Sequence, residues 1–285
     1  MTKLSGKVAL VTGAGRGIGQ AIAVKLASEG ASIVLNDLDE GPAGETVAAI
    51  EALGNIRGGA AEVCLGDVTA DDFADRFVGA AVERFGGIDI IVNNAGYTWD
   101  GVIQKSTDPQ WEAMLAVHLT APFRILRAAS EFIRAAAKRE AEAGEPVHRK
   151  VVNISSISGI CGNAGQVNYA AAKAGVVGMT KALAKEWGRY RVNVNCVAFG
   201  LIDTRLTRPR GAEDHIVAMP GSNDKPGAEI RMGIPAEAHQ AIVAATPLGR
   251  AGTPEDAANA VYLLCTPESD FITGQLVMAT GGFMY

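Results

Sequence analysis

Short apolar runs alternate along the chain with longer segments in which apolar and polar residues are mixed. The first run, Lys7–Thr12, reads KVALVT, and the second, Ser32–Asp37, begins SIVL. Runs of this length without polar alternation are typical of strands that are buried on both faces of a parallel sheet. Five further strands are predicted at 61–65, 88–92, 150–154, 191–198 and 275–279.

The segments between these runs favour helices. Thr69, followed by acidic residues, has the composition of a helix start. Strands that alternate with helices predict an α/β fold: a single-domain, Rossmann-type, doubly wound parallel sheet of about seven strands with helices on both faces. The domain is expected to span residues 1–285, with an irregular insertion at 205–246 that is rich in Gly and Pro. One predicted helix follows the glycine-rich loop and ends at Glu29. The other predicted helices cover 41–54, 108–118, 120–143, 168–187 and 254–265.

The composition excludes several functional classes. The 285 residues carry a net charge of −5 and no long cluster of Lys or Arg, so no nucleic-acid partner is expected. Four scattered cysteines and four histidines form no metal-ligand spacing, so no metal site is predicted. The sequence shows no signal peptide, and the uncharged stretch 151–172 contains too many polar residues for a membrane span. We expect a cytoplasmic protein.

A glycine-rich loop follows the first predicted strand and precedes a helix. Gly13, Gly17 and Gly19 let backbone N–H groups approach a pyrophosphate, although a tight turn without a ligand is the alternative. Asp37 ends the second strand, where a carboxylate accepts hydrogen bonds from an adenosine ribose and repels a 2′-phosphate. The sequence therefore favours NAD over NADP, with Arg16 as the opposing signal.

Three side chains in 150–173 suit proton transfer to an alcohol oxygen. Tyr169 and Lys173 are four residues apart and share one face of a predicted helix. Ser156 ends a predicted strand, where open α/β sheets bind their ligands. Each residue taken singly also has a simpler structural explanation. Tyr169 would then be an interfacial tyrosine, Lys173 a solvated lysine and Ser156 a serine that ends a strand.

Six motifs, in order, carry a family resemblance. They are TGAGRGIG at 12–19, DV at 67–68, NNAG at 93–96, ISS at 154–156, YAAAK at 169–173 and TGQLVMATGG at 273–282. Together they resemble the short-chain dehydrogenase/reductase family over nearly the whole chain. The run GNAGQVNYAAAKAG at 162–175 is most similar to 3-oxoacyl-thioester reductases and 3-hydroxyacyl-CoA dehydrogenases. The resemblance implies an NAD(H)-dependent oxidoreductase that interconverts a secondary alcohol and a ketone. The expected substrate is a 3-hydroxyacyl or 3-oxoacyl thioester, such as a CoA thioester.

The resemblance also implies roles for individual residues. Tyr169 would be the general acid and base, its pKa lowered by Lys173. Ser156 would hydrogen-bond the substrate oxygen. Substrate contacts are expected from Ser156, Gln166 and Phe199. Cofactor contacts are expected from Gly13, Arg16, Gly17, Ile18, Gly19, Asp37, Asp67, Val68, Asn93, Ala95, Gly96, Tyr169, Lys173, Ile202 and Thr204.

Two positions depart from the family pattern. His118 stands where many members have an Asn that relays protons; it is either a catalytic relay or a buried core residue. Phe199 stands where Pro is common and suggests a bulky or apolar substrate wall.

Some alternatives stay open from the sequence. The stretch 205–246, with Met219 and Lys225 among its apolar and basic residues, is either a substrate lid or a tolerated surface insertion. The chain is alternatively a hydroxysteroid or other lipophilic-alcohol dehydrogenase, or a dinucleotide-binding sensor without turnover. A homo-oligomer, tetramer or dimer, is expected from the resemblance.

Overall fold

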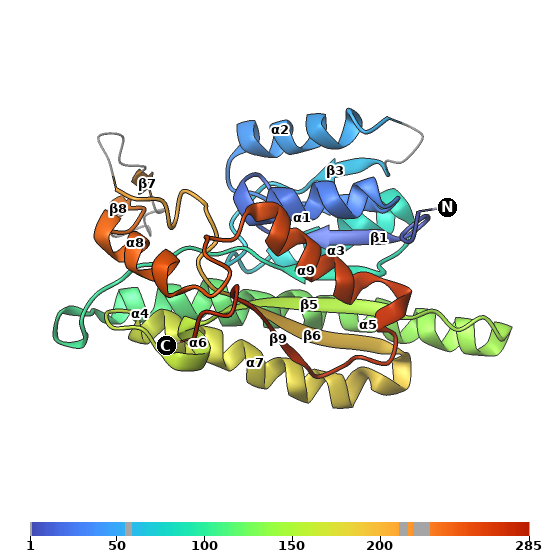
Figure 1. Cartoon of the computed structure of the whole chain (residues 1–285). Coiled ribbons are helices and arrows are strands. Elements are labelled where there is room, and N and C mark those ends of the chain that lie inside the picture. Colours follow the sequence, from blue (N-terminus) through green and yellow to red (C-terminus); the bar gives the residue numbers. More distant parts are fainter. Residues whose placement is uncertain (1, 55–58, 211–215, 219–228, 285) are drawn as a thin grey trace.

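The computed structural model describes residues 2–54, 59–210, 216–218 and 229–284 (Figure 1). Seven parallel strands form one sheet in the order β3-β2-β1-β4-β5-β6-β9, which confirms the predicted sheet. The strands are β1 (Val8–Val11), β2 (Ser32–Leu35), β3 (Ala61–Val63), β4 (Ile90–Asn93), β5 (Arg149–Ser156), β6 (Val192–Phe199) and β9 (Leu276–Ala279).

The strand order reverses next to β1. The chain runs outward from β1 to β2 and β3, and then returns to pair β4 with the other side of β1. Such a switch point leaves a crevice at the carboxyl ends of the two strands, where open α/β sheets bind ligands. The glycine-rich loop follows β1 and the NNAG segment begins in β4, so both motifs lie at this crevice.

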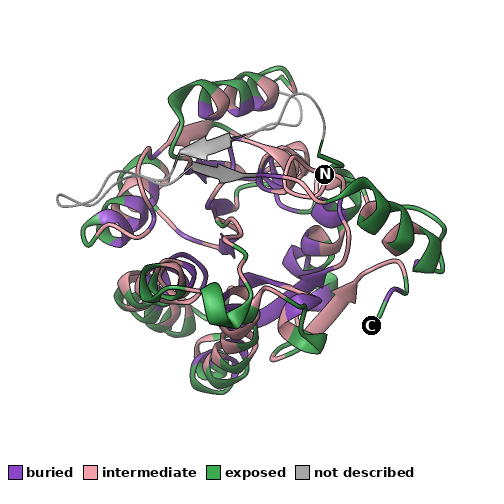
Figure 2. Ribbon diagram, turned by 90° about the vertical axis from the view of Figure 1, so that its left-hand side faces the viewer, coloured by how far each residue is buried: buried purple, intermediate pink, exposed green. Residues whose placement is uncertain are grey.

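Helices cover both faces of the sheet, and two clusters of buried residues form the core between them (Figures 1 and 2). In β1, Ala9 and Val11 pack on one side, whereas Val8 and Leu10 pack on the other. This explains why the strand is a continuous apolar run. On the first side lie α1 (Gly17–Ser28), α2 (Glu40–Glu51) and α9 (Pro254–Cys265), and on the second lie α3 (Phe73–Phe85), α5 (Ala121–Ala143) and α7 (Val167–Trp187).

Capping side chains determine where two helices begin. The Thr253 hydroxyl accepts a hydrogen bond from the backbone N–H of Asp256, and the Asp256 carboxylate accepts one from the Thr253 N–H at 2.8 Å. Thr107 and Gln110 form the same reciprocal pair at the start of α4 (Asp108–Leu115). Each pair satisfies N–H groups that the first helical turn leaves without partners.

The predicted helices 108–118 and 120–143 join differently than expected. After α4, residues Ala116–Thr120 form a π-helical segment that leads directly into α5. Single π turns inside α-helices are frequent at functional sites because they redirect a side chain. The side chain in question is His118, which lies in the middle of this segment.

The stretch 205–246 contains more regular structure than its sequence suggests. Residues Ala236–Ala245 form α8, and β7 (Ile216–Ala218) pairs antiparallel with β8 (Glu229–Arg231). The prediction of an irregular stretch is therefore wrong for these segments, because the prolines and glycines flank α8 rather than interrupt it. Met219 and Lys225, named for the lid, lie outside the described residues. A short helix, α6 (Ser158–Cys161), was also not predicted.

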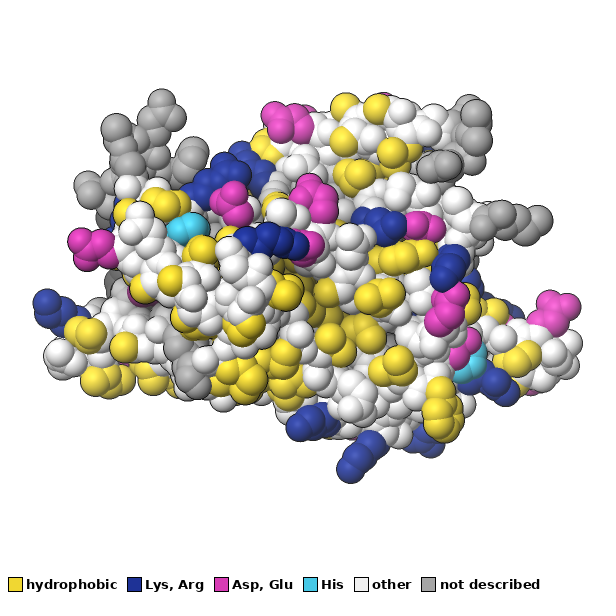
Figure 3. All heavy atoms as spheres, in the orientation of Figure 1, with side chains coloured by type: hydrophobic (Ala, Val, Ile, Leu, Met, Phe, Trp, Pro, Cys, Tyr) yellow, Lys and Arg dark blue, Asp and Glu magenta, His cyan; other side chains and the backbone are white. Residues whose placement is uncertain are grey.

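Within the described part of the chain, no helix combines the length and the apolar character needed to cross a membrane. Apolar side chains nevertheless gather on the face that carries α9 and β9 (Figure 3). Leu263, Phe271 and Ile272 are large exposed apolar residues at the end of α9 and before the edge strand β9. The homo-oligomer stays a prediction.

Candidate active site

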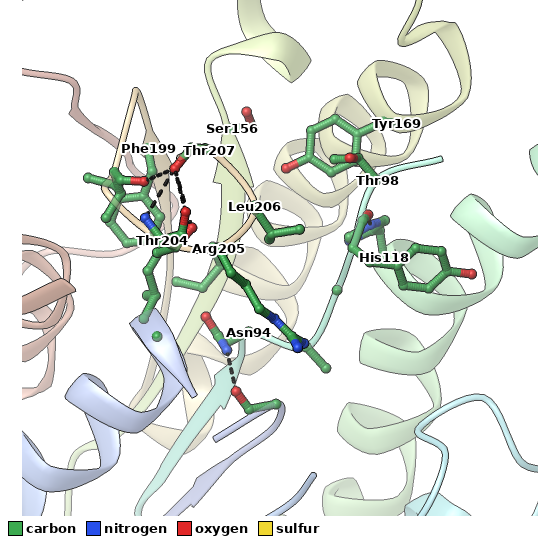
Figure 4. A pocket seen from close by; sticks show the side chains of 18 of the residues that line it. Asn94, Thr98, His118, Ser156, Tyr169, Phe199, Thr204, Arg205, Leu206 and Thr207 are labelled. Carbon is green, nitrogen blue, oxygen red and sulfur yellow. Dashed lines mark hydrogen bonds between the residues drawn. The ribbon is translucent and has the colours of Figure 1, made fainter. Parts of the chain in front are cut away.

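A cleft of about 1120 Å³ opens at the carboxyl ends of the central strands. Figure 4 shows that Ser156, Tyr169 and His118, from three separate elements, face its interior and that Arg205 reaches across it. All but one of the residues predicted for the site line this cleft. They are Gly13, Arg16, Gly17, Ile18, Gly19, Asp37, Asp67, Val68, Ala95, Gly96, His118, Ser156, Gln166, Tyr169, Lys173, Phe199, Ile202 and Thr204.

The exception is Asn93. Its side chain is buried within the sheet, where Nδ2 donates to Asn153 Oδ1 at 2.8 Å. The Asn93 side chain therefore does not face the cleft, because the last residue of β4 still follows the pleat of the buried strand, and its contact with the cofactor stays a prediction. Its neighbour Asn94 lines the cleft instead and donates to the carbonyl of Gly13 at 3.1 Å.

The glycine loop is packed too closely for side chains. A Cβ at Gly19 would lie 2.0 Å from the carbonyl oxygen of Gly13 and 2.5 Å from Asn94 Nδ2. No side chain caps the start of α1, so its first N–H groups face the cleft without a side-chain acceptor. Backbone N–H groups at a helix N-terminus bind phosphates. This cradle fits the pyrophosphate of a dinucleotide.

The ribose end of the cleft carries both signs of charge. Asp37 is already engaged: its Oδ2 accepts from Gly15 N–H at 2.8 Å and its Oδ1 from Asp39 N–H at 3.2 Å. Arg16 pairs with Asp39 at 2.5 Å. The pKa of Arg205 is lowered by burial and by the positive field of Arg16, so the two guanidinium groups face the same region. An anion placed there would lie close to two cations, Arg16 and Arg205, and to the carboxylates of Asp37 and Asp39.

Lys173 lies on the cleft wall behind Tyr169. It is 4% exposed, its Nζ donates to the carbonyl of Ile154 at 2.8 Å, and it lies 5.7 Å from the centroid of the Tyr169 ring. Burial lowers the pKa of Lys173 to about 8. At neutral pH the ammonium therefore remains the main form, close to the point at which it releases a proton.

Burial dominates the electrostatics of Tyr169. The pKa of Tyr169 is raised to about 12, chiefly by burial, with an opposing hydrogen bond with Ser156 and a smaller rise from Asp100. Tyr169 is consequently protonated at neutral pH. A lowering of this pKa by Lys173 stays a prediction.

His118 is neutral and packs against Tyr169. Its ring meets the Tyr169 ring edge-on, with centroids 5.0 Å apart. Nε2 lies 2.7 Å from the carbonyl oxygen of Tyr97 and must therefore carry the proton. Burial holds the pKa of His118 well below its usual value. Its Nδ1 is an acceptor that has no hydrogen-bond partner among the described residues.

Comparison with known proteins identifies the family. The family model described as short chain dehydrogenase matches residues 7–215, and a model described as Enoyl-(Acyl carrier protein) reductase matches 220–284. The chain belongs to the short-chain dehydrogenase/reductase family. It is 37% identical to a 3-oxoacyl-(acyl-carrier-protein) reductase of Vibrio cholerae, over 98% of each chain, and 33% identical to that of Thermotoga maritima, over 99% of each. Nodulation protein G of a Rhizobium species is 35% identical, over 99% of this chain and 98% of its own.

The matched relatives contradict the predicted preference for NAD. The 3-oxoacyl-(acyl-carrier-protein) reductases that match this short-chain dehydrogenase depend on NADPH, so the expectation of NAD with NADP less favoured is wrong. The structure gives a physical reason. Two cations, Arg16 and Arg205, face the same end of the cleft as the Asp37 carboxylate and oppose its repulsion of a 2′-phosphate.

Asn94, Asp100 and Arg205 are among the further residues that line the cleft without having been predicted. Asn94 belongs to the NNAG motif, which itself marked this part of the chain. No sequence motif marks Arg205, because its place at the cleft depends on the path of the chain after β6. Asp100 follows the same strand as Asn94 by a few residues, and only the fold brings it towards Gln166.

Gly96 leaves room for the His118 ring. A Cβ at position 96 would lie 2.1 Å from His118 Cε1 and 2.6 Å from Nδ1. We expect Gly96→Ala to displace the ring and to lower kcat at least about 10-fold, since misplacing groups around Tyr169 by about 1 Å is costly. Gly44→Ala is the matched control, because a Cβ there meets nothing within 4 Å. Equal activity of the two variants would contradict this packing role.

Proposed function

We propose that this short-chain dehydrogenase reduces the ketone of a 3-oxoacyl thioester, carried on acyl carrier protein, to the 3-hydroxyacyl thioester with NADPH. One observation carries the proposal: Ser156, Tyr169 and Lys173 line one cleft with the glycine cradle at the carboxyl edge of the sheet. The substrate class is supported by the names of the relatives, which are 3-oxoacyl-(acyl-carrier-protein) reductases.

The bound dinucleotide supplies the hydride and its two electrons. Tyr169 donates its hydroxyl proton to the ketone oxygen as that oxygen gains negative charge. Ser156 donates a hydrogen bond to the same oxygen and stabilises the charge. The C3 carbon thereby gains a hydrogen, the oxygen gains a proton, and the cofactor is oxidised. Lys173, with a pKa of about 8, holds a proton near the phenolate until solvent restores the phenol.

The charge state of Tyr169 supports reduction. A phenol with a pKa of about 12 is protonated at neutral pH, which is the form that donates a proton. The reverse reaction needs the phenolate, so we propose that alcohol oxidation rises with pH. Ketone reduction would stay near its maximum over the neutral range.

Arg205 is proposed to bind the 2′-phosphate of NADPH together with Arg16. A charged hydrogen bond of this kind contributes roughly 1.5–3 kcal/mol. We expect Arg205→Ala to raise the Kd for NADPH about 10-fold or more and the Kd for NADH far less, measured by quenching of protein fluorescence. Equal weakening of both cofactors would contradict a phosphate-specific role. Arg189→Ala serves as the control, because Arg189 is exposed and does not line the cleft.

The substrate is tested by initial rates of NADPH oxidation. Three ketones are compared: 3-oxobutyryl acyl carrier protein, 3-oxobutyryl-CoA and a bulky cyclic ketone. The proposal expects turnover of both thioesters, with the higher kcat/KM on acyl carrier protein. Turnover of the cyclic ketone alone would overturn it and support a lipophilic-alcohol dehydrogenase.

A further inference from the structure

A chain of hydrogen bonds crosses the substrate end of the cleft towards Ser156. Gln166 Nε2 donates to both carboxylate oxygens of Asp100 at 3.1 Å. Gln166 Oε1 accepts from Ser158 Oγ at 2.9 Å and from Asn163 Nδ2 at 3.0 Å. The backbone N–H of Ser158 donates to Ser156 Oγ at 3.2 Å. Asp100 is thereby connected, through the stretch 156–166, to the hydroxyl of Ser156.

Asp100 determines the orientation of the Gln166 side-chain amide. A side-chain amide has a donor end and an acceptor end, and either can face a given neighbour. Both Asp100 oxygens act as acceptors here, so they select the NH₂ end of Gln166. The amide oxygen is then directed to Ser158 and Asn163, on the loop that contains α6. The polar atoms of Gln166 are therefore engaged within the protein, and its contact with a substrate stays a prediction.

The last bond in the chain orients Ser156. Because Ser156 Oγ accepts the N–H of Ser158, the hydroxyl hydrogen must point elsewhere. Tyr169 and the cleft interior lie on that side, and Ser156 and Tyr169 share a hydrogen bond. A displaced Ser158 would release the hydroxyl to other rotamers and cost the stabilisation of the developing charge.

We propose that Asp100 is a positioning residue, which fixes Gln166 and, through Ser158, holds the Ser156 hydroxyl towards the ketone oxygen. The inference rests on the proposed function only in naming a ketone as the group that Ser156 meets. Asp100 is exposed at the mouth of the cleft and packs in no core, so its removal does not open a cavity.

Asp100 has an electrostatic effect in addition to its geometric one. Its negative charge raises the pKa of Tyr169. The other groups that face Tyr169 are Lys173 on α7, neutral His118 on the π-helical segment and Ser156 on β5. Burial raises the pKa of the Asp100 carboxyl, and this rise is opposed by the hydrogen bond from Gln166 and by the positive charge of Arg210 in the stretch after β6. Removal of the charge alone should thus ease formation of the phenolate.

Two substitutions separate the geometric effect from the electrostatic one. Asp100→Asn keeps an acceptor for Gln166 but removes the charge, so kcat for reduction should stay within about threefold of the wild type. Its alcohol-oxidation profile should shift to lower pH. Asp100→Ala removes the acceptor, so kcat should fall about 10- to 100-fold while KM changes less. Asp108→Ala, an exposed aspartate outside the cleft, is the matched control.

Coupling through Gln166 gives an independent readout. If Asp100 acts through Gln166, the Asp100→Ala/Gln166→Leu double variant should be no slower than the slower single variant. All rates are measured on whichever ketone of the panel the wild type reduces fastest, so rejection of thioesters would overturn the proposed substrate alone. An Asp100→Ala variant with wild-type kcat, or multiplicative losses in the double variant, would overturn the positioning role.

Discussion

Replacing Tyr169 with Phe is expected to lower kcat for ketone reduction by about 10²- to 10⁴-fold, the range that a positioned proton donor contributes. The substitution removes one hydroxyl and keeps the ring, so the edge-on contact with His118 at 5.0 Å is preserved. The Kd for NADPH should change by less than about threefold, because the cradle and the arginines remain. Stopped-flow rates and fluorescence titration measure the two quantities separately.

Tyr190→Phe is the control for this experiment. Tyr190 lies in the short helical turn after α7 and does not line the cleft. Its loss of a hydroxyl should leave kcat unchanged. A Tyr169→Phe variant with more than about a tenth of the wild-type kcat would contradict the assignment of Tyr169 as proton donor.

Replacing Arg149 with Met is expected to lower the free energy of unfolding by about 3 kcal/mol, as for other buried pairs that lose one partner. Arg149 is 5% exposed and binds Glu140 with both terminal nitrogens, NH1 at 2.9 Å and NH2 at 2.5 Å. Its Nε donates to the carbonyl of Ile88 at 2.9 Å. Methionine fills the space but leaves the Glu140 carboxylate and the Ile88 carbonyl without the hydrogen bonds that Arg149 donates. Urea unfolding measures the change.

The effect of Arg149→Met should depend on pH. The hydrogen bond from Arg149 lowers the pKa of Glu140 below its ordinary value of 4.5, so folding favours the carboxylate. The Arg149–Glu140 pair therefore contributes its full share to the free energy of unfolding above the pKa that Glu140 has in the unfolded chain. This contribution is lost as the pH falls through the lower pKa of Glu140 in the folded chain. The difference between wild type and variant should be constant near pH 7 and shrink below pH 4.5.

Arg84→Met provides the comparison. Arg84 pairs with Glu62 at 3.5 Å, and the two side chains are 59% and 42% exposed. Exposed pairs contribute about 0–1 kcal/mol because water and salt screen them. If Arg84→Met destabilised the chain as much as Arg149→Met, burial would not be what makes the Arg149 pair important.

The sheet and most helices were predictable because their signals are local. A strand buried on both faces favours an apolar run, which β1 has as VALV and β2 as IVL, whereas the apolar runs of β5 and β6 are interrupted by asparagines. The relation of Tyr169 to Lys173 was equally local, since one helical turn sets it. Ser156 was predicted at the same site because ligands generally bind at the carboxyl ends of parallel strands, and Ser156 ends such a strand.

The sequence was least informative where the outcome depends on neighbours that are distant in sequence. Whether the side chain of Asn93 or that of Asn94 faces the cleft depends on where the pleat of β4 ends. The pKa of Tyr169 depends on how completely the folded chain removes water from the phenol. The preference for NAD failed because Arg205 comes close to Arg16 only in the folded chain.

The most direct test of the proposed function follows the hydride itself. The wild-type enzyme is given a 3-oxobutyryl thioester and NADPH that carries deuterium at the transferable position, and the product is analysed by mass spectrometry. The account predicts one deuterium at C3 of a 3-hydroxybutyryl thioester, with none formed by Tyr169→Phe in the same time. Product without deuterium at C3, or no product from any 3-oxoacyl thioester, would contradict it.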